Sequence, residues 1–198
     1  MILPEFERPQ NFTIIDQWND DLIQKATEIY EQGLGQEYIS AEDLKRYIAK
    51  SECIVIGAMV DSSLAGVMIA YPMMSEESEK YDRELYENKV PQIFQGRNVG
   101  LVKSVSVENK FRRRGIGTQL ILESMQRLNE KGCDLFFAVS WYSGLKDSSP
   151  SIFESLEFIK AVKISDYWTE DSLKEGYMCP VDGNPCHCSA IFFFKNSR

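Results

Sequence analysis

The chain has 198 residues, of which 43% are hydrophobic and 26% are charged. This balance is typical of a folded globular protein and excludes a disordered or fibrous chain. The formal net charge of −8 argues against general affinity for nucleic acid, because such binding depends on Lys and Arg side chains that neutralise phosphates. The charge mildly favours a cationic partner such as an amine. Surface acids that only keep the protein soluble explain the same charge.

The N-terminal residues, Met1 to Arg8, carry acids where a secretory signal would carry bases followed by an apolar run. Apolar stretches such as residues 53–60 and 191–194 are far shorter than the roughly 20 residues of a membrane-spanning helix. We therefore expect a cytoplasmic protein that does not associate with membranes. The sequence leaves a homodimer open.

The first third of the chain predicts a strand, two helices and a hairpin. Residues 12–18 are rich in β-branched and aromatic side chains and predict a strand, which a helix over about 22–33 follows. Apolar residues at helical spacing predict a second helix over 41–48. Two β-rich runs, 53–60 and 64–71, flank a turn of Asp and Ser and predict an antiparallel hairpin.

Residues 72–98 form a long, polar and acidic stretch. It is too long for an ordinary connection inside a compact domain. We expect an insertion that is partly helical and that partly lies over the functional site.

The middle of the chain predicts a strand–helix–strand unit. Residues 99–107 alternate apolar and polar side chains at their end, as a strand with one buried face does. Five apolar residues between 116 and 128 lie at helical spacing, and Gly132 stands where a C-terminal capping glycine belongs. Residues 134–142 predict the next strand.

The last third predicts a short helix and two further strands. Ser149 is the expected N-cap of that helix and Pro150 its first residue. Strands are expected over 159–164 and 190–194. The order of elements predicts an α/β protein with a mixed, mostly antiparallel sheet and helices on both faces. We expect residues 1–198 to form one domain.

A basic turn with two glycines, Arg112-Arg113-Arg114-Gly115-Ile116-Gly117, joins the strand at 99–107 to the following helix. The first amide groups of a helix lack intrahelical partners and can hold a pyrophosphate. Glycines let the backbone approach phosphates without an intervening Cβ atom. Cations at this end oppose the helix dipole unless an anion is bound. A solvated basic turn is the alternative that the motif alone leaves open.

The stretch from Ser104 to Leu120 resembles the central motif of the GNAT family of N-acetyltransferases, whose core is (Gln/Arg)-x-x-Gly-x-(Gly/Ala). The order of elements from about residue 12 to 165 is similar to that family, and residues 153–158 resemble its Tyr-x-x-x-Gly-Phe ending. The resemblance implies the GNAT fold and transfer of an acetyl or other short acyl group to an amine. The amine attacks the thioester directly, and holding both reactants together supplies much of the rate.

The same resemblance implies that acetyl-CoA is the cosubstrate and that the acceptor is an amine of a small molecule or a protein. The backbone of Val105 and Val107 would pair with the pantetheine arm. The amides that would hold the pyrophosphate are those of Arg112, Arg113, Arg114, Gly115, Ile116, Gly117 and Thr118.

The sequence departs from the family pattern where the acid and base are expected. Phe153 stands where the family usually has a tyrosine that protonates the leaving thiolate, and Glu157 replaces a glycine. Tyr142 and Tyr167 are candidate substitutes, although packing in the sheet explains each as well. Glu108 is a candidate general base. A catalytically weakened acyl-CoA-binding or regulatory domain is therefore the alternative to an enzyme.

Residues 179–188 combine potential metal ligands: Cys179, Asp182, Cys186, His187 and Cys188. The three cysteines with either Asp182 or His187 would complete a Zn²⁺ site. The alternatives are a plain loop with reduced thiols, or a disulfide from Cys179 to Cys186 or Cys188. A zinc ion here would clamp the tail rather than catalyse, because four protein ligands leave no open position.

Overall fold

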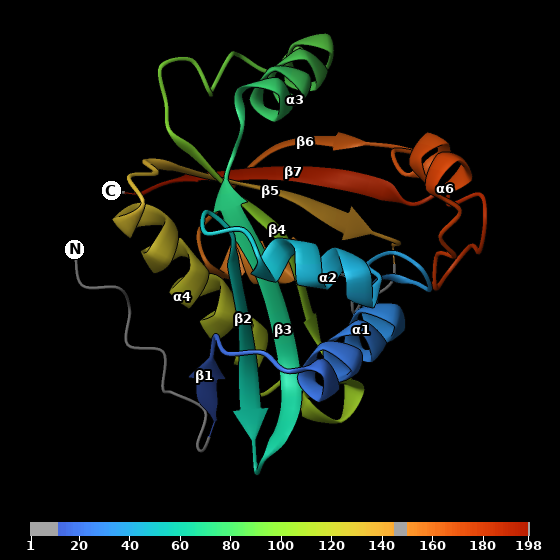
Figure 1. The fold of residues 1–198 in the computed structure, drawn as a ribbon. Helices are drawn as coiled ribbons and strands as arrows, with labels where there is room; N and C mark the ends of the chain where they lie inside the picture. The colour runs from blue at the N-terminus through green and yellow to red at the C-terminus, as the bar shows by residue number, and fades with distance from the viewer. Residues whose placement is uncertain (1–11, 145–149, 198) are drawn as a thin grey trace.

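The computed structural model describes residues 12–144 and 150–197. In this part of the chain seven strands form a sheet in the order β1-β2-β3-β4-β5-β7-β6 (Figure 1). The strands are β1 (Thr13–Ile15), β2 (Ile54–Val60), β3 (Ser63–Pro72), β4 (Val99–Val107), β5 (Leu135–Tyr142), β6 (Ile159–Ile164) and β7 (Ser189–Asn196). The helices are α1 (Asp20–Leu34), α2 (Ala41–Ile48), α3 (Ser75–Glu87), α4 (Ile116–Glu130), α5 (Pro150–Ser155) and α6 (Thr169–Glu175).

Neighbouring strands are antiparallel except β4 and β5, which are parallel. This confirms the predicted mixed, mostly antiparallel sheet. The first strand is shorter than the predicted 12–18, and the hairpin of β2 and β3 has the predicted position. The expected N-cap, Ser149, lies outside the described residues.

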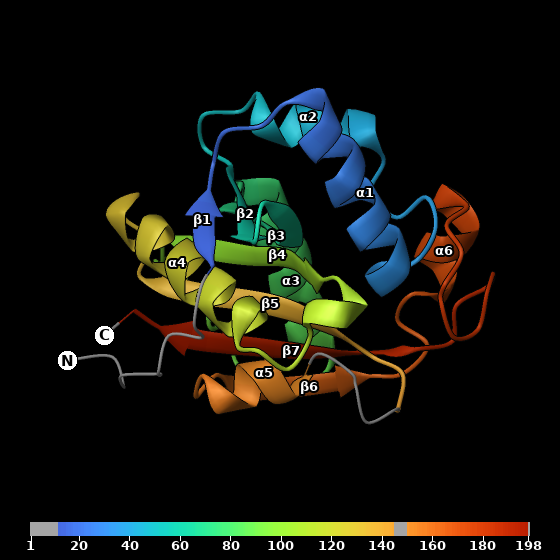
Figure 2. The ribbon, with the colours of Figure 1, turned by 90° about the horizontal axis from the view of Figure 1, so that it is seen from below.

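Helices cover both faces of the sheet (Figure 2). On one face α4 packs against β2, β3 and β4 and buries the predicted apolar stripe: Ile116, Leu120, Ile121, Met125 and Leu128. On the other face α1 and α2 cover β2 and β3 through Ile29, Tyr30 and Leu44, none of which is exposed. Full burial of an aliphatic side chain of this size contributes about 1.5–3 kcal/mol each. Both faces of the central strands are therefore fixed by packing.

Side-chain caps mark the starts of α1 and α2. The side chain of Asn19 accepts a hydrogen bond from the amide of Leu22 at 2.9 Å and starts α1. Ser40 and Asp43 form a reciprocal capping box that starts α2. Residues 35–40, here named the α1–α2 loop, are thus held at both ends by helices.

The sequence predicted that the acidic stretch is partly helical without giving the bounds of α3, and it did not predict α6. The acidic stretch contains α3, whose Leu85 is buried, and the ring of Tyr81 in α3 lies 5.1 Å from that of Phe137 in β5. α3 therefore packs on the sheet. α6 precedes a segment without regular structure that leads to β7. Among the described residues, no helix combines the length and the apolar composition that crossing a membrane requires.

The sheet opens between its two parallel strands. Parallel pairing joins only residues 99–102 of β4 to 135–138 of β5. β4 continues to Val107 along β3, and β5 continues to Tyr142 along β7, so the two strands diverge (Figure 1). Residues 103–107 and 139–142 thus face each other across a space, here named the strand gap.

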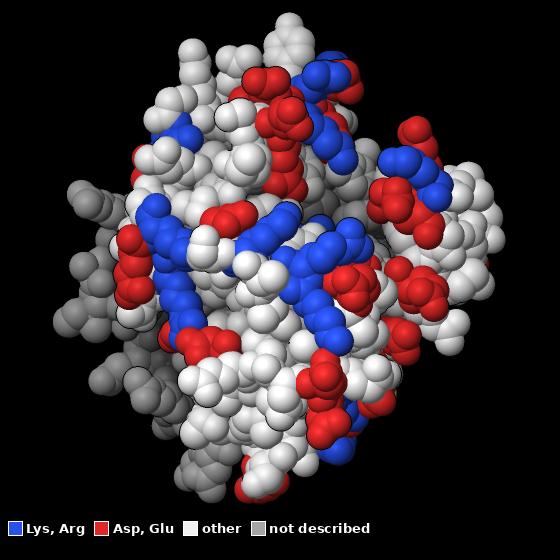
Figure 3. Space-filling model, viewed as in Figure 1, with Lys and Arg blue, Asp and Glu red and all other residues white. Residues whose placement is uncertain are grey.

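Acidic and basic side chains are interspersed over the side of the molecule that is seen in the view of Figure 1 (Figure 3).

Candidate active site

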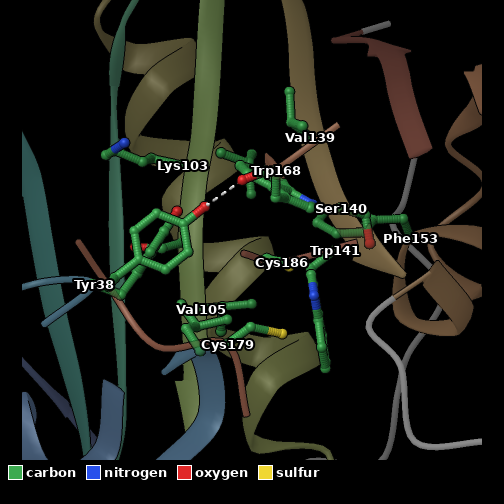
Figure 4. Close-up of a pocket in the computed structure, with 14 residues that line it drawn as sticks. Tyr38, Lys103, Val105, Val139, Ser140, Trp141, Phe153, Trp168, Cys179 and Cys186 are labelled. Carbon is green, nitrogen blue, oxygen red and sulfur yellow. Dashed lines mark hydrogen bonds between the residues drawn. The ribbon is translucent and has the colours of Figure 1, made fainter. Parts of the chain in front are cut away.

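A pocket occupies the strand gap. The described residues that line it are Leu34, Tyr38, Val102, Lys103, Ser104, Val105, Val139, Ser140, Trp141, Phe153, Trp168, Tyr177, Cys179 and Cys186. Lys103 and Val105 from β4 stand on one side, and Val139, Ser140 and Trp141 from β5 stand on the other (Figure 4). The walls are largely aromatic and aliphatic, and no carboxylate is present among these lining residues.

The edge of β4 that faces the gap suits an extended ligand. Val105 and Val107 are half-buried and belong to the part of β4 that β5 no longer pairs. Two serines that alternate with these valines fasten the strand to α1, since Ser104 Oγ donates to the Tyr30 hydroxyl at 3.1 Å and Ser106 Oγ donates to the Ile29 carbonyl at 2.8 Å. A rigid strand with one free edge can accept a ligand arm as an added strand.

The basic turn ends at a helix N-terminus of the predicted kind. Gly115 is the N-cap of α4 with φ 75° and ψ 0°, a left-handed conformation that suits glycine. Arg113 also has a positive φ, of 62°. The three arginines are exposed; Arg112 Nε donates to the Val107 carbonyl at 2.9 Å, and the Arg114 guanidinium lies 5.6 Å from the Phe111 ring centre. Amide groups and positive charge thus meet at one end of the strand gap, as pyrophosphate binding requires.

Phe153 lines the pocket as a packed aromatic residue. Its side chain is buried, its ring stacks on Phe193 at 5.5 Å, and it meets Phe158 edge-on at 5.2 Å. Glu157, at the glycine position of the family pattern, has φ 60°. The local turn therefore keeps a left-handed residue although glycine is replaced.

The two tyrosines proposed from the sequence as proton donors do not line the pocket. The ring of Tyr142 lies 4.5 Å from Lys163 Nζ. The Tyr167 hydroxyl donates to Glu84 Oε2 at 2.8 Å, and burial, with the nearby tyrosine and carboxylate, raises the pKa of Tyr167 above its ordinary value. These contacts favour a structural role for Tyr167.

Two other tyrosines line the pocket, Tyr38 of the α1–α2 loop and Tyr177 after α6. Their rings meet edge-on with centroids 5.4 Å apart, and the Tyr177 hydroxyl donates to the Trp168 carbonyl at 3.4 Å. Burial raises the pKa of Tyr177. Neither residue belongs to a motif, and both lie in irregular segments far apart in the chain. No signal in the sequence identifies them.

Glu108, the candidate base, is held by two lysines. Its carboxylate oxygens lie 3.2 Å from Lys25 Nζ and 3.2 Å from Lys110 Nζ. Burial favours its neutral form, but the attraction of Lys25 and Lys110 outweighs burial and lowers the pKa of Glu108 below its ordinary value. It does not line the pocket. A carboxylate with a lowered pKa is a weak base, so these contacts favour a structural role.

The C-terminal segment brings together four of the five candidate metal ligands named from the sequence. The thiols of Cys179, Cys186 and Cys188 and a carboxylate oxygen of Asp182 all lie within 4.8 Å of one another. His187 is separate, because its ring Nδ1 lies 3.2 Å from the carboxylate of Asp166. All five cysteines of the chain are free.

Comparison with known proteins identifies the family. Residues 15–142 match the Acetyltransferase (GNAT) family. The fold is similar to the ribosomal-protein-alanine N-acetyltransferase of Brucella melitensis, with a TM-score of 0.63, 14% identity and coverage of 93% of this chain and 99% of that one. Among the curated proteins no match is found.

Two further solved structures share the fold. The Drosophila melanogaster polyamine N-acetyltransferase has a TM-score of 0.62 at 14% identity and covers 94% of this chain and 100% of its own. An acetyltransferase of Bacillus subtilis in complex with CoA has a TM-score of 0.58 at 14% identity, with 94% and 97% covered. The family match spans most of the sheet, the basic turn and α4. The chain therefore belongs to the GNAT acetyltransferase family and is an N-acetyltransferase that uses acetyl-CoA.

Proposed function

We propose that the acceptor is a primary monoamine on an apolar or aromatic body. The observation that carries this proposal is the lining of the pocket, which combines aromatic walls with Lys103 and has no carboxylate among its described residues. Aromatic and aliphatic walls suit an apolar body. A second cationic group on the acceptor would be buried beside Lys103 without an anionic partner, which is costly. This refines the expectation of a cationic partner drawn from the net charge.

Lys103 supports the proposal through its charge. Burial disfavours the ammonium form, but the neighbourhood of Tyr38, Tyr47 and Glu77 outweighs burial, and the pKa of Lys103 is raised. The residue is therefore cationic at neutral pH. A cation and apolar walls both lower the pKa of an amine bound beside them. The pocket itself thus favours the uncharged amine that attacks the thioester, and a strong general base is not required.

The donor end is assigned to the residues named from the sequence. The amides from Arg112 to Thr118 bind the pyrophosphate, and the free edge of β4 at Val105 and Val107 holds the pantetheine arm. The thioester then lies in the strand gap. The pocket there holds both reactants, and their positioning accelerates the reaction. Tyr177 donates the proton to the leaving thiolate in place of a tyrosine at position 153. Its place in the pocket wall supports this role.

The experiment compares acceptors by the release of free CoA. Phenethylamine and an uncharged peptide with a free N-terminus represent monoamines, and agmatine and spermidine represent acceptors with a second cation. We expect kcat/KM to be at least about tenfold higher for the monoamines, which corresponds to about 1.4 kcal/mol. Equal or better turnover of agmatine and spermidine would overturn the acceptor assignment.

Two lysine variants test whether the charge of Lys103 causes the preference for monoamines. Lys103→Met should narrow the preference for monoamines, because it removes the charge that opposes a second cation. Lys163→Met is the matched control, since this ammonium lies over the ring of Tyr142 and does not line the pocket. An unchanged preference in Lys103→Met would show that Lys103 does not set the specificity.

A further inference from the structure

The geometry of the C-terminal segment points to a zinc site. We propose that Cys179, Asp182, Cys186 and Cys188 bind one Zn²⁺ ion in tetrahedral coordination. We further propose that this ion fastens residues 177–188, here named the cysteine segment, as a wall of the pocket. Zinc binding does not depend on the proposed acceptor, whereas its effect on the pocket rests on the proposed function.

The donor atoms surround a space of the right size for one ion. With Zn–S bonds of about 2.3 Å, two sulfurs of a tetrahedral site lie about 3.8 Å apart. The sulfurs of Cys179 and Cys188 are separated by 3.8 Å. The sulfur of Cys188 lies 3.2 Å from Asp182 Oδ2, and all four donors lie within 4.8 Å of one another. The side chains are therefore already gathered as a single coordination shell.

A tight backbone turn presents the first two ligands. The amide of Cys179 donates to the Gly183 carbonyl at 2.9 Å, and the amide of Gly183 donates back to the Cys179 carbonyl at 3.0 Å. Gly183 has φ 78°, a conformation that glycine adopts without strain. This turn brings Cys179 and Asp182, three residues apart, to the same side of the segment.

Hydrogen bonds around the cluster would support charged ligands. The amide of Val181 lies 3.5 Å from the sulfur of Cys179 as a donor, and the amide of His187 donates to Asp182 Oδ2 at 3.0 Å. Outer-shell donors of this kind orient metal ligands and stabilise their negative charge. The bond from the His187 amide to Asp182 favours Asp182 over His187 as the fourth ligand. The backbone of His187 supports Asp182 while its ring points to Asp166.

The chemistry of the ligands selects the metal. Three thiolates and one carboxylate suit Zn²⁺, whereas Mg²⁺ and Ca²⁺ prefer sites made of oxygen ligands. The three cysteines are buried, and Trp141 and Trp168 pack against them. A disulfide would join only two of the three cysteines and would leave the third thiol and Asp182 unused. One zinc ion satisfies all four groups.

The cluster also borders the pocket. Cys179 and Cys186 are lining residues, and Tyr177 precedes the first ligand by two positions (Figure 4). The Cys186 amide donates to Ser172 Oγ of α6 at 2.9 Å. Between α6 and β7 the chain has no regular helix or strand. Bound zinc would therefore fix the conformation of this wall and the position of Tyr177.

Metal analysis of the purified full-length protein tests the site. We expect about one zinc per chain, as a tetrahedral structural site implies. Cys179→Ser, Cys186→Ser and Cys188→Ser should each lose most of the bound zinc. Cys53→Ser is the matched cysteine control and His187→Ala the matched histidine control, and both should keep full occupancy. Equal zinc in all variants, or a wild-type protein that binds none after zinc is added and excess removed, would overturn the proposal.

Substitution with cobalt keeps the test independent of folding defects. Co²⁺ added to the metal-free wild type should give thiolate-to-metal charge transfer in the near ultraviolet and intense visible bands of a tetrahedral site. Asp182→Asn, which preserves shape, should weaken cobalt binding and alter those bands. A spectrum of octahedral cobalt without charge transfer would contradict cysteine ligation. An intact mass lower by two hydrogen atoms in the unreduced protein, with no metal, would show a disulfide instead.

The link to the pocket is tested separately. Removing zinc with a chelator should lower the thermal midpoint and raise KM for the amine more than KM for acetyl-CoA, and adding zinc back should restore both. Normal zinc binding with no preference for monoamines would contradict the proposed function alone. Zinc loss without any change in amine kinetics would contradict the role of the ion in the pocket wall.

Discussion

The amide of Met178 donates a hydrogen bond to the carbonyl of Gln36 at 3.0 Å. This bond joins the α1–α2 loop to the cysteine segment, and the edge-on contact of Tyr38 with Tyr177 lies beside it. Two irregular segments from opposite ends of the chain thus form one side of the pocket. A change in this contact should therefore affect the kinetics with the amine acceptor more than the binding of acetyl-CoA.

Gly35 makes this contact possible, and Gly35→Ala should disrupt it. Gly35 has φ 118°, and a Cβ atom there would lie 2.2 Å from the Met178 carbonyl oxygen. We expect the variant to lose about 2 kcal/mol of stability and to lower kcat/KM for the amine about tenfold, with KM for acetyl-CoA unchanged. Urea unfolding and steady-state kinetics measure both effects. Gly176→Ala is the control, because its φ is 79° and nothing lies within 4 Å of the added atom. Equal losses in the two variants would show that only backbone strain matters.

Gly115 tests the donor site. Gly115→Ala places a strained residue at the N-cap of α4, where φ is 75°, and shifts the amides assigned to the pyrophosphate. We expect KM for acetyl-CoA to rise about tenfold or more, with little change in KM for the amine. Gly132→Ala provides a matched control near the other end of α4, since its φ is 85° and an added Cβ atom meets nothing. If both variants bind acetyl-CoA equally, the helix N-terminus does not hold the pyrophosphate.

Phenylalanine substitutions at Tyr177 and Tyr167 distinguish between these two candidate proton donors. Tyr177→Phe should lower kcat about a hundredfold without a comparable change in KM for acetyl-CoA, because general acid catalysis contributes on the order of 10²–10⁴. Tyr167→Phe should keep kcat, since its hydroxyl is bound to Glu84 and does not line the pocket. The pH profile of kcat should change only in Tyr177→Phe. A drop in kcat for Tyr167→Phe alone would reinstate that residue.

The ion pairs of Glu108 should make a pH-dependent contribution to the stability of the folded protein. Burial opposes its charge, but its ion pairs with Lys25 and Lys110 outweigh burial, and its pKa in the folded state lies below the ordinary value of 4.5. A lowered pKa means that the contribution is complete above 4.5 and is lost as the pH falls through the folded value. Lys25→Met should cost about 1–2 kcal/mol at neutral pH and little near about pH 3, measured by urea unfolding.

The control for this prediction is Lys50→Met at an exposed lysine, which should not depend on pH in this way. The activity of the Glu108→Gln variant shows whether Glu108 has a structural role or acts as the general base. We expect its kcat to stay within about twofold of the wild type, because its carboxylate is outside the pocket lining. A large fall in kcat with normal stability would identify Glu108 as the base.

The sequence predicted the fold class, the family and the reaction, and these predictions are confirmed. Periodicity sufficed for α4, because its apolar stripe packs on one face of the sheet. It did not suffice for α6, whose only described buried residue is Ser172. The assignments of acetyl-CoA contacts to Val105, Val107 and residues 112–118 stay predictions.

The part of the pocket lining that Tyr38 and Tyr177 form could not be predicted from the sequence, for a physical reason. Tyr38 and Tyr177 reach the pocket through loops whose positions depend on long-range contacts, and neither has a local pattern. Phe153 stands where the family pattern has a tyrosine, and the candidates that we expected to reach the same space, Tyr142 and Tyr167, do not line the pocket. The dense spacing of Cys179, Asp182, Cys186 and Cys188 was a local signal, and the structure gathers these side chains.

The parallel ladder between β4 and β5 is short, so the two halves of the sheet on either side of it share few strand-pairing hydrogen bonds. Among the described residues, strand pairing between the half of the sheet formed by β1 to β4 and the half formed by β5 to β7 is limited to residues 99–102 and 135–138. A donor molecule that hydrogen-bonds to both edges of the strand gap would extend this seam. Binding should then slow amide hydrogen exchange in residues 103–107 and 139–142 together. The cosubstrate would act as a removable brace between the two halves of the enzyme.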